Sequence, residues 1–187
     1  MESKTVYFDR PGPENTDAVL GLARQRAGEL GIKTVLVAST KGDTAVRAVD
    51  AFPDLKVIIV THSTGFRAPD TQEFTEENRA LVESKGGTVF TATHLFAGLS
   101  RAVRTKFQTY IIGDIVASTL RVLGEGMKVV CEIAVMAADA GLVRTDEEVI
   151  SIGGTGHGAD TAVVLTPMNS QNFFDLRVKE ILCKPRL

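Results

Sequence analysis

The 187-residue sequence has no tryptophan and only two cysteines, and aromatic residues make up 6% of it. Cys131 and Cys183 both lie in apolar segments, and the sequence contains no C-x-x-C pair. The disulfide framework that is typical of small secreted proteins is therefore not indicated. We expect both cysteines to be free thiols that fill the core of a cytoplasmic protein.

Long apolar runs are also absent. No stretch of about 18 apolar residues occurs, which predicts no transmembrane helix, and the opening residues MESKTVYFDR lack the apolar core of a signal peptide. Lysine and arginine number 21 against 23 aspartate and glutamate, for a net charge of −2. This near balance predicts no general attraction to nucleic acid or to an acidic membrane surface.

Several common catalytic and nucleotide-binding signatures are missing. There is no G-x-x-x-x-G-K-[ST] sequence and no G-x-G-x-x-G after a predicted strand, which argues against a standard triphosphatase or Rossmann site. No Ser-His-Asp or Cys-His pattern has a recognisable local signature. His62, His94 and His157 are separated by 32 and 63 residues, which matches no metal motif. We predict no metal site, and proton transfer or ligand contact suits His157 better.

Strand-like and helix-like patterns alternate along the chain. Short β-rich runs occupy residues 5–8, 33–38, 57–61, 88–93, 148–152, 161–165 and 174–182. Helical patterns occupy residues 15–30, 44–51, 75–85, 94–106, 110–123 and 127–140. Since residues 127–140 are apolar nearly all round, that helix should be buried. With no internal repeat or flexible linker, the alternation predicts one α/β domain over residues 1–187.

The segment Lys33–Ala45, KTVLVASTKGDTA, is the most informative stretch. It predicts a buried strand, a hydroxyl-rich turn and the start of a helix, whose first turn presents N–H groups and a positive dipole. One interpretation is an anion site, most plausibly for phosphate. Its candidate contacts are Ser39, Thr40, Lys41, Gly42, Asp43 and Thr44. The other interpretation is an ordinary turn that binds nothing, with Asp43 as the helix N-cap.

Two further loops leave the ends of predicted strands and carry polar or glycine residues. If the strands are parallel, all three loops meet at the carboxyl edge of the sheet, where ligands bind in open α/β sheets. The candidate residues of the second loop are Thr61, His62, Gly65 and Phe66. Those of the glycine-rich third loop are Gly153, Gly154, Thr155, Gly156, His157 and Thr161. Its glycines suit either a second ligand cradle or a tight connection between two strands.

Charged residues in the later helices have two interpretations each. Arg101, Arg104 and Lys106 are able to bind an anion, but such a run is more often a solvated helix face, which is the interpretation we prefer. Three acids fall in otherwise apolar helices: Asp114, Glu132 and Asp139. One of them could be buried at a site with a shifted pKa. We favour acids that face solvent or form ion pairs, because buried acids are uncommon unless paired.

The two ends of the chain resemble a known family. The segment ENTDAVLGLARQRAGELGIKTVLVASTKGDTAVRAV with VIIVTH, and the later EEVISIGGTGHGADTAVVL, resemble the carboxy-terminal α/β domain of pyruvate kinase. The segment GMKVVCEIAVMAADAGLVRTDEEVISIGGTGHGADTAVVL is more similar to small stand-alone proteins with this domain, found largely in archaea. The resemblance implies a three-layer α/β/α fold with a mostly parallel sheet. It also implies no pyruvate kinase activity, since the catalytic barrel is missing.

The same resemblance implies a phosphorylated ligand. In many pyruvate kinases the two matching loops bind a phosphorylated sugar effector, at positions that correspond to Ser39, Thr40, Gly42, Thr44, Gly154, Gly156 and Thr161. Asp43 departs from that pattern and argues against a bisphosphate sugar. The stand-alone relatives are associated with flavin mononucleotide (FMN). The resemblance therefore implies an FMN-binding protein, with Phe66 stacking on the ring, and allows a flavin-dependent redox function. A sensor of a phosphorylated metabolite and a module with no ligand remain alternatives, and precedent for the domain implies a homo-oligomer.

Overall fold

The fold is known from a computed structural model, which describes residues 3–186. Seven strands form one sheet in the order β1-β7-β6-β5-β2-β3-β4. Their bounds are β1 (Val6–Phe8), β2 (Thr34–Ala38), β3 (Lys56–Val60), β4 (Thr88–Phe90), β5 (Val149–Gly153), β6 (Thr161–Thr166) and β7 (Arg177–Pro185). Strands β5, β2, β3 and β4 are parallel to one another, as β1 is to β7, and β6 is antiparallel to both β5 and β7. The mostly parallel sheet predicted from the sequence is confirmed.

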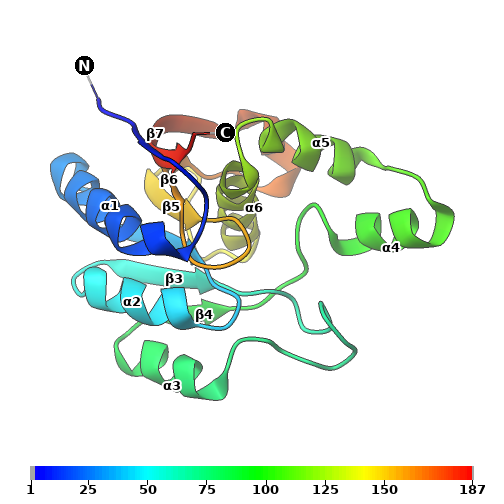
Figure 1. Cartoon of the computed structure of the whole chain (residues 1–187), viewed down its shortest axis with the longest axis horizontal. Coiled ribbons are helices and arrows are strands. Elements are labelled where there is room, and N and C mark those ends of the chain that lie inside the picture. Colours follow the sequence, from blue (N-terminus) through cyan, green and yellow to red (C-terminus); the bar gives the residue numbers. More distant parts are fainter. Residues whose placement is uncertain (1–2, 187) are drawn as a thin grey trace.

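Helices cover both faces of this sheet (Figure 1). They are η1 (Pro13–Asn15), α1 (Thr16–Leu30), α2 (Asp43–Ala51), α3 (Glu76–Ser84), α4 (Gly98–Phe107), α5 (Ile112–Arg121), α6 (Glu125–Asp139) and η2 (Ser170–Asp175). Helices α1, α2 and α3 pack on one face, and α6 packs on the other. Among residues 3–186, no helix has the length and apolar composition that crossing a bilayer would need.

Side chains that alternate along the central strands separate the two halves of the core. Val35 and Val37 of β2 point toward α1 and α2, whereas Leu36 between them points toward α6. The same strand is therefore buried on both faces, which explains its continuous apolar run. Helix α6 is enclosed almost completely, with twelve of its fifteen residues buried. This agrees with the nearly uniform apolar composition that predicted a buried helix.

Local signals predicted several element ends correctly. Gly31 ends α1 in a left-handed conformation with φ of 69°, and the Thr75 hydroxyl accepts a hydrogen bond from the Asn78 N–H at the start of α3. Two predictions need correction. The fourth helix begins at Gly98 rather than at His94, and the strand predicted over 174–182 is preceded by η2 and runs instead over Arg177–Pro185.

Both cysteines are free and buried in the core, as expected from their apolar surroundings. Burial raises the pKa of Cys131 to about 11 and that of Cys183 to about 12. Neither thiol should therefore react with iodoacetamide at about pH 8 in the folded protein, because the thiolate is the reactive form. Intact-mass spectrometry should show no added label on the native chain and two labels in denaturant. Labelling of the native chain at the denatured rate would contradict this placement.

Candidate functional site

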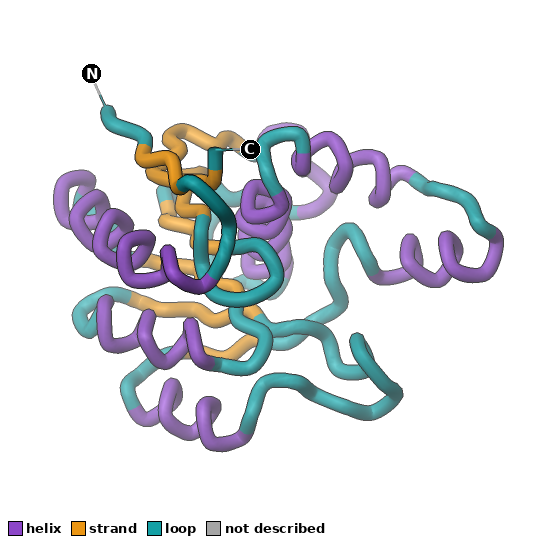
Figure 2. Tube along the Cα trace, viewed as in Figure 1, coloured by secondary structure: helices purple, strands orange, loops and turns teal. Residues whose placement is uncertain are grey.

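A cleft of about 620 Å³ opens at the carboxyl ends of β2, β3 and β5. It is lined by the three loops that follow these strands and by residues of α4, α5 and α6. Figure 2 shows these loops gathered on the same side of the strands. Because β5, β2 and β3 are parallel neighbours, their carboxyl ends share one edge of the sheet. The three loops that the sequence singled out therefore line one cleft.

The loop between β2 and α2 presents free hydrogen-bonding groups to this cleft. Ser39 and Thr44 are only 8% and 6% exposed, and both line the cleft. Within residues 3–186, neither hydroxyl has a protein hydrogen-bond partner. No side chain caps the first turn of α2 either. The loop thus has unsatisfied hydroxyl and N–H groups at the positive end of a helix dipole.

Gly42, rather than Asp43, is the N-cap of α2, so the predicted role of Asp43 as a cap is wrong. Gly42 has φ of 110°, and a Cβ there would lie 2.4 Å from the Cβ of Asn78. The Asn78 amide also donates to the carbonyl oxygen of Lys41 over 3.0 Å. This glycine is therefore required by the packing of α3 on the loop, which alone accounts for it. Asp43 is the exposed first residue of the helix and lines the cleft.

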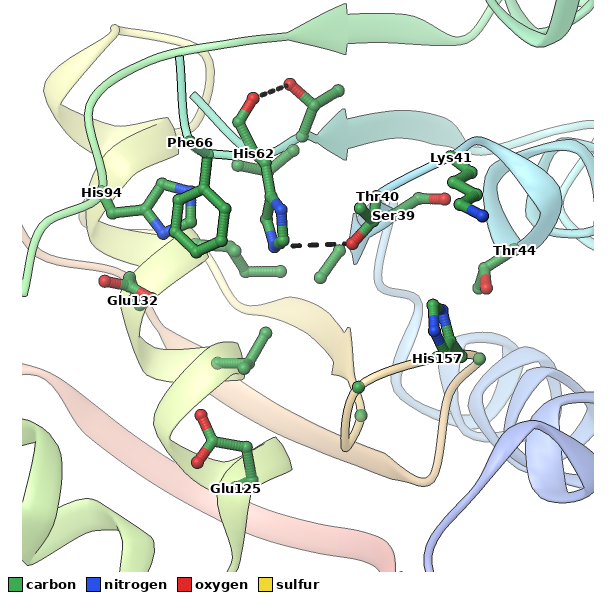
Figure 3. A pocket seen from close by; sticks show the side chains of 18 of the residues that line it. Ser39, Thr40, Lys41, Thr44, His62, Phe66, His94, Glu125, Glu132 and His157 are labelled. Carbon is green, nitrogen blue, oxygen red and sulfur yellow. Dashed lines mark hydrogen bonds between the residues drawn. The ribbon is translucent and has the colours of Figure 1, made fainter. Parts of the chain in front are cut away.

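Two imidazoles and a phenyl ring form a cluster on the opposite side of the cleft (Figure 3). The His62 ring centroid lies 4.2 Å from that of Phe66 and 5.2 Å from that of His94, and Phe66 stacks on His94 at 5.0 Å. The Arg101 guanidinium lies over the Phe66 ring, with its Cζ 4.5 Å from the ring centroid. We call His62, Phe66, His94 and Arg101 the ring cluster. It offers flat apolar surface and a cation to a ligand.

His62 connects this cluster to the hydroxyl loop. Its Nδ1 lies 2.8 Å from Glu73 Oε2, and its Nε2 lies 3.5 Å from Thr40 Oγ1. Burial raises the pKa of Glu73, but hydrogen bonds from His62 and Arg67 outweigh burial and bring it below the ordinary value. The ionised Glu73 thus holds the imidazole so that Nε2 faces Thr40 and the cleft. Such an arrangement can move a proton to or from a bound ligand.

His94 is held differently. Its Nε2 accepts a hydrogen bond from the Ser63 N–H over 3.2 Å, which leaves the ring proton on Nδ1. Burial lowers the pKa of His94, although the nearby Glu132 carboxylate acts in the other direction. The ring is therefore neutral at pH 7. It serves as a stacking surface rather than as a cation.

The glycine-rich loop is the connection between the antiparallel strands β5 and β6. Asp160 closes it: its N–H donates to the Gly153 carbonyl over 3.1 Å, and its carboxylate accepts from the Thr155 N–H and the Thr161 hydroxyl. A Cβ on Gly154 would lie 2.6 Å from the Gly158 carbonyl oxygen. Gly154 therefore serves a tight connection between the two strands, which was one of the two interpretations of this loop.

The same loop is attached to the beginning of the chain. A Cβ on Gly158 would lie 2.3 Å from the Cα of Pro13, and the Ala159 N–H donates to the Thr16 hydroxyl over 3.0 Å. The Thr16 hydroxyl in turn donates to the Pro13 carbonyl over 2.7 Å. Pro13 and Thr16 consequently line the cleft as well. Sequence reasoning missed both, because only this long-range contact brings them there.

Of the sixteen predicted contact residues, eleven line the cleft and five do not. Those that line it are Ser39, Thr40, Lys41, Asp43, Thr44, Thr61, His62, Phe66, Gly154, Gly156 and His157. Those outside the lining are Gly42, Gly65, Gly153, Thr155 and Thr161. Thr161 is buried against Asp160, and Gly42 and Gly153 are buried within their elements.

Positive charge dominates the cleft although the chain as a whole carries −2. Three carboxylates line it, against seven lysine and arginine side chains: Lys41, Arg47, Arg67, Arg101, Arg104, Arg121 and Lys128. Five of the seven form ion pairs. Lys41 and Arg101 have no carboxylate partner within residues 3–186. These two cations remain available to an anionic ligand.

Arg101 is exposed and the Arg104 side chain is 43% exposed, as expected of a solvated helix face, and both also line the cleft, while Lys106 does not. Of the three acids, Asp114 is buried and paired with Arg104, and Asp139 accepts hydrogen bonds from Ser170 and Asn169. Asp114 thus forms an ion pair and Asp139 is exposed to solvent, which are the two outcomes of the interpretation that we favoured.

Glu132 is both buried and at the site. It pairs with Lys128 one turn away on α6, and its other oxygen accepts the Phe96 N–H over 2.9 Å. The pair therefore fixes the segment that carries His94 to the buried helix. Lys128 was missed from the sequence. The available signal was an oppositely charged pair at i and i+4 inside an otherwise apolar helix.

Comparison with known proteins now gives the family. A family model described as pyruvate kinase, alpha/beta domain, matches residues 17–165. The chain belongs to that family. Crystal structures of pyruvate kinase from Cryptosporidium parvum are similar at 11% identity with a TM-score of 0.43, and at 10% with 0.41. A third, in complex with ADP, is similar at 12% identity with a TM-score of 0.39.

These matches cover 82%, 85% and 80% of this chain but only 23%, 23% and 22% of the pyruvate kinases. The chain thus spans about a quarter of the length of these proteins. Among residues 3–186, no cluster of three histidine, cysteine or acidic side chains is arranged to hold a metal ion.

Gly156 and Gly158 of the β5–β6 loop give a matched test of the contact between Gly158 and Pro13. Gly156 and Gly158 both have positive φ, 79° and 71°, but only Gly158 has no room for a Cβ. Gly156→Ala should lower the free energy of unfolding by about 1 kcal/mol through backbone strain alone. Gly158→Ala should lower it by roughly 3 kcal/mol, since the Cβ also displaces Pro13. Urea denaturation measures both, and equal losses would refute the contact.

The buried imidazole of His94 predicts a pH dependence. Its pKa is below the ordinary 6.5 in the folded protein, so the unfolded chain binds the proton more readily. Its contribution to stability is complete above pH 6.5 and is lost as the pH falls from 6.5 toward the folded pKa. NMR titration of the His94 ring should give a midpoint below 6.5, which returns to 6.5 in denaturant. A native midpoint at or above that value would contradict this burial.

Proposed function

We propose that this pyruvate kinase alpha/beta domain binds a small phosphorylated ligand in the cleft, with FMN as the first candidate. The observation that carries the proposal is the pair of hydroxyls of Ser39 and Thr44, which line the cleft at the uncapped start of α2 and have no hydrogen-bond partner within residues 3–186. Phosphate oxygens accept hydrogen bonds from such hydroxyls and from the N–H groups of a helix N-terminus. Lys41, which has no carboxylate partner among the described residues, adds a positive charge beside them.

The surroundings of this loop support one phosphate rather than two. Asp43 carries a negative charge in the same turn, and the arginines nearby are mostly occupied by carboxylates. A second phosphate would meet Asp43 without enough free cations to offset the repulsion. A monoester such as FMN therefore fits the charge of the loop better than a bisphosphate sugar does.

The remainder of the cleft suits a flat ring system. The aromatic side chains of Phe66 and His94 line the cleft, and its volume of about 620 Å³ lies within the roughly 300–1,000 Å³ of small-molecule sites. The choice of a flavin itself rests on the resemblance to stand-alone relatives. When bound, FMN supplies hydride and electron transfer. His62, oriented by Glu73, is the residue able to exchange a proton beside it.

Riboflavin has the ring system of FMN but lacks its phosphate. Comparing the two ligands therefore tests the phosphate site separately from the ring site. The purified protein should quench FMN fluorescence on titration and should bind riboflavin about 10–100-fold more weakly, as expected for lost charged hydrogen bonds. Thr44→Val keeps the shape of a buried side chain but removes its hydroxyl. It and Lys41→Met should reduce the preference for FMN over riboflavin while leaving riboflavin affinity unchanged.

The matched control is Lys33→Met, which removes a lysine at the opposite end of β2 and should change neither affinity. Equal affinity for FMN and riboflavin would remove the phosphate site from the proposal. Failure of both flavins to bind, with stabilisation against heat by sugar phosphates, would instead favour a sensor of a phosphorylated metabolite.

A further inference from the structure

Exposed apolar side chains gather on one part of the molecule. Seven of the ten exposed large apolar residues found within residues 3–186 lie between positions 99 and 123. They are Leu99, Phe107, Tyr110, Ile112, Ile115, Val122 and Leu123. These positions belong to α4, α5 and the segments that follow each helix, which form the part of the molecule farthest from α1 (Figure 1). Exposed apolar surface on this scale marks an interaction site.

The exposed residues of α5 form a regular stripe. Ile112, Ile115 and Val122 are 70%, 57% and 79% exposed, and with Thr119 they follow a spacing of three, four and three residues. That spacing places all four on one face of the helix. The Thr119 hydroxyl donates to the Ile115 carbonyl over 2.9 Å, so its polar group is already satisfied along the helix. We call these four residues the α5 stripe.

The face of α5 opposite this stripe is already used. Ala117 is buried, and Leu120 packs against the part of the core built around α6. Helix α5 is therefore apolar on both sides, and only one side is covered within the chain. A three-four spacing of apolar residues is the pattern that packs against another helix.

The charges of α5 decide between partners. The helix carries two charged residues: Asp114, buried and paired with Arg104, and Arg121, paired with Glu125 over 2.5 Å. Within α5, therefore, no charged residue beside the stripe is unpaired. An anionic membrane would favour a helix rich in lysine and arginine on its polar face, which α5 is not. A neutral stripe can meet an identical stripe without repulsion between like charges.

We propose that the α5 stripe is the centre of a two-fold dimer, in which α5 of one copy packs along α5 of a second copy. An interface of this kind is self-complementary, so one apolar patch serves both partners. Burying seven side chains of this size on each copy approaches the roughly 800 Å² per partner of a standard interface. The neighbouring Leu99, Phe107 and Tyr110 would complete it around the α5 stripe.

The proposed dimer would also support the cleft from behind. Arg104 of α4 is tied to Asp114 of α5, and Arg121 at the end of α5 is tied to Glu125 of α6. Arg101, Arg104, Arg121 and Glu125 all line the cleft. A partner that covers the outer side of α5 therefore restrains the helix to which these cleft-lining arginines are tied. The inference stands on the surface alone and does not require FMN to be the ligand.

Sedimentation velocity and light scattering on the full chain test the proposal. The wild-type protein should have twice the 20.1 kDa mass of one chain. Val122→Glu and Ile112→Glu each place an unpaired carboxylate at the interface and should weaken the dimer by roughly a hundredfold or more. Both positions are exposed in the single chain, so circular dichroism and the melting curve at high dilution should match the wild type.

Tyr7→Glu is the matched control, because Tyr7 is an exposed apolar residue on β1, outside α4 and α5. It should remain dimeric. A wild-type chain that is monomeric at every concentration would overturn the proposal, and so would dimers that survive both α5 substitutions. A monomer that binds vesicles of phosphatidylserine and phosphatidylcholine, and loses this binding with Ile112→Glu, would identify a membrane as the partner instead.

Discussion

The parallel pairing of β2 with β3 on one side and β5 on the other is the constraint on which the site depends. It aligns the ends of three strands that are distant in sequence, so the loops that follow them must share one edge. The pairing also buries β2 on both faces, between α1 and α2 on one side and α6 on the other. Slipping β2 by one residue would exchange the two sets of core side chains and separate the loops.

The arrangement of elements was largely predictable because their signals are local. Runs such as Val57–Val60 are β-branched throughout, and Gly31 and Thr75 mark helix ends by backbone and side-chain chemistry. The antiparallel orientation of β6 was not predictable from its sequence. It depends on the tight connection closed by Asp160, whose hydrogen bonds become visible only in three dimensions.

Most of the site residues that lie in loops could be predicted from the sequence, whereas most of those that lie in helices could not. Polar residues after strands predict an edge site, whereas the cleft-facing side of an apolar helix depends on what packs around it. This is why Lys128 was missed. Gly42 has a structural reason that the sequence did not show, because a Cβ there would meet the side chain of Asn78. FMN stays a prediction.

The hydrogen bond from Ala159 to Thr16 joins residues 143 positions apart, and Gly158 packs on Pro13 at the same place. The cleft therefore draws one of its walls from the beginning of the chain and another from near its end. During synthesis, the ribosome must release the segment that forms β5 and β6 before this wall can exist. Contacts so distant in sequence also close slowly. The cleft is thus completed late in folding, only after both of these distant segments have been synthesised.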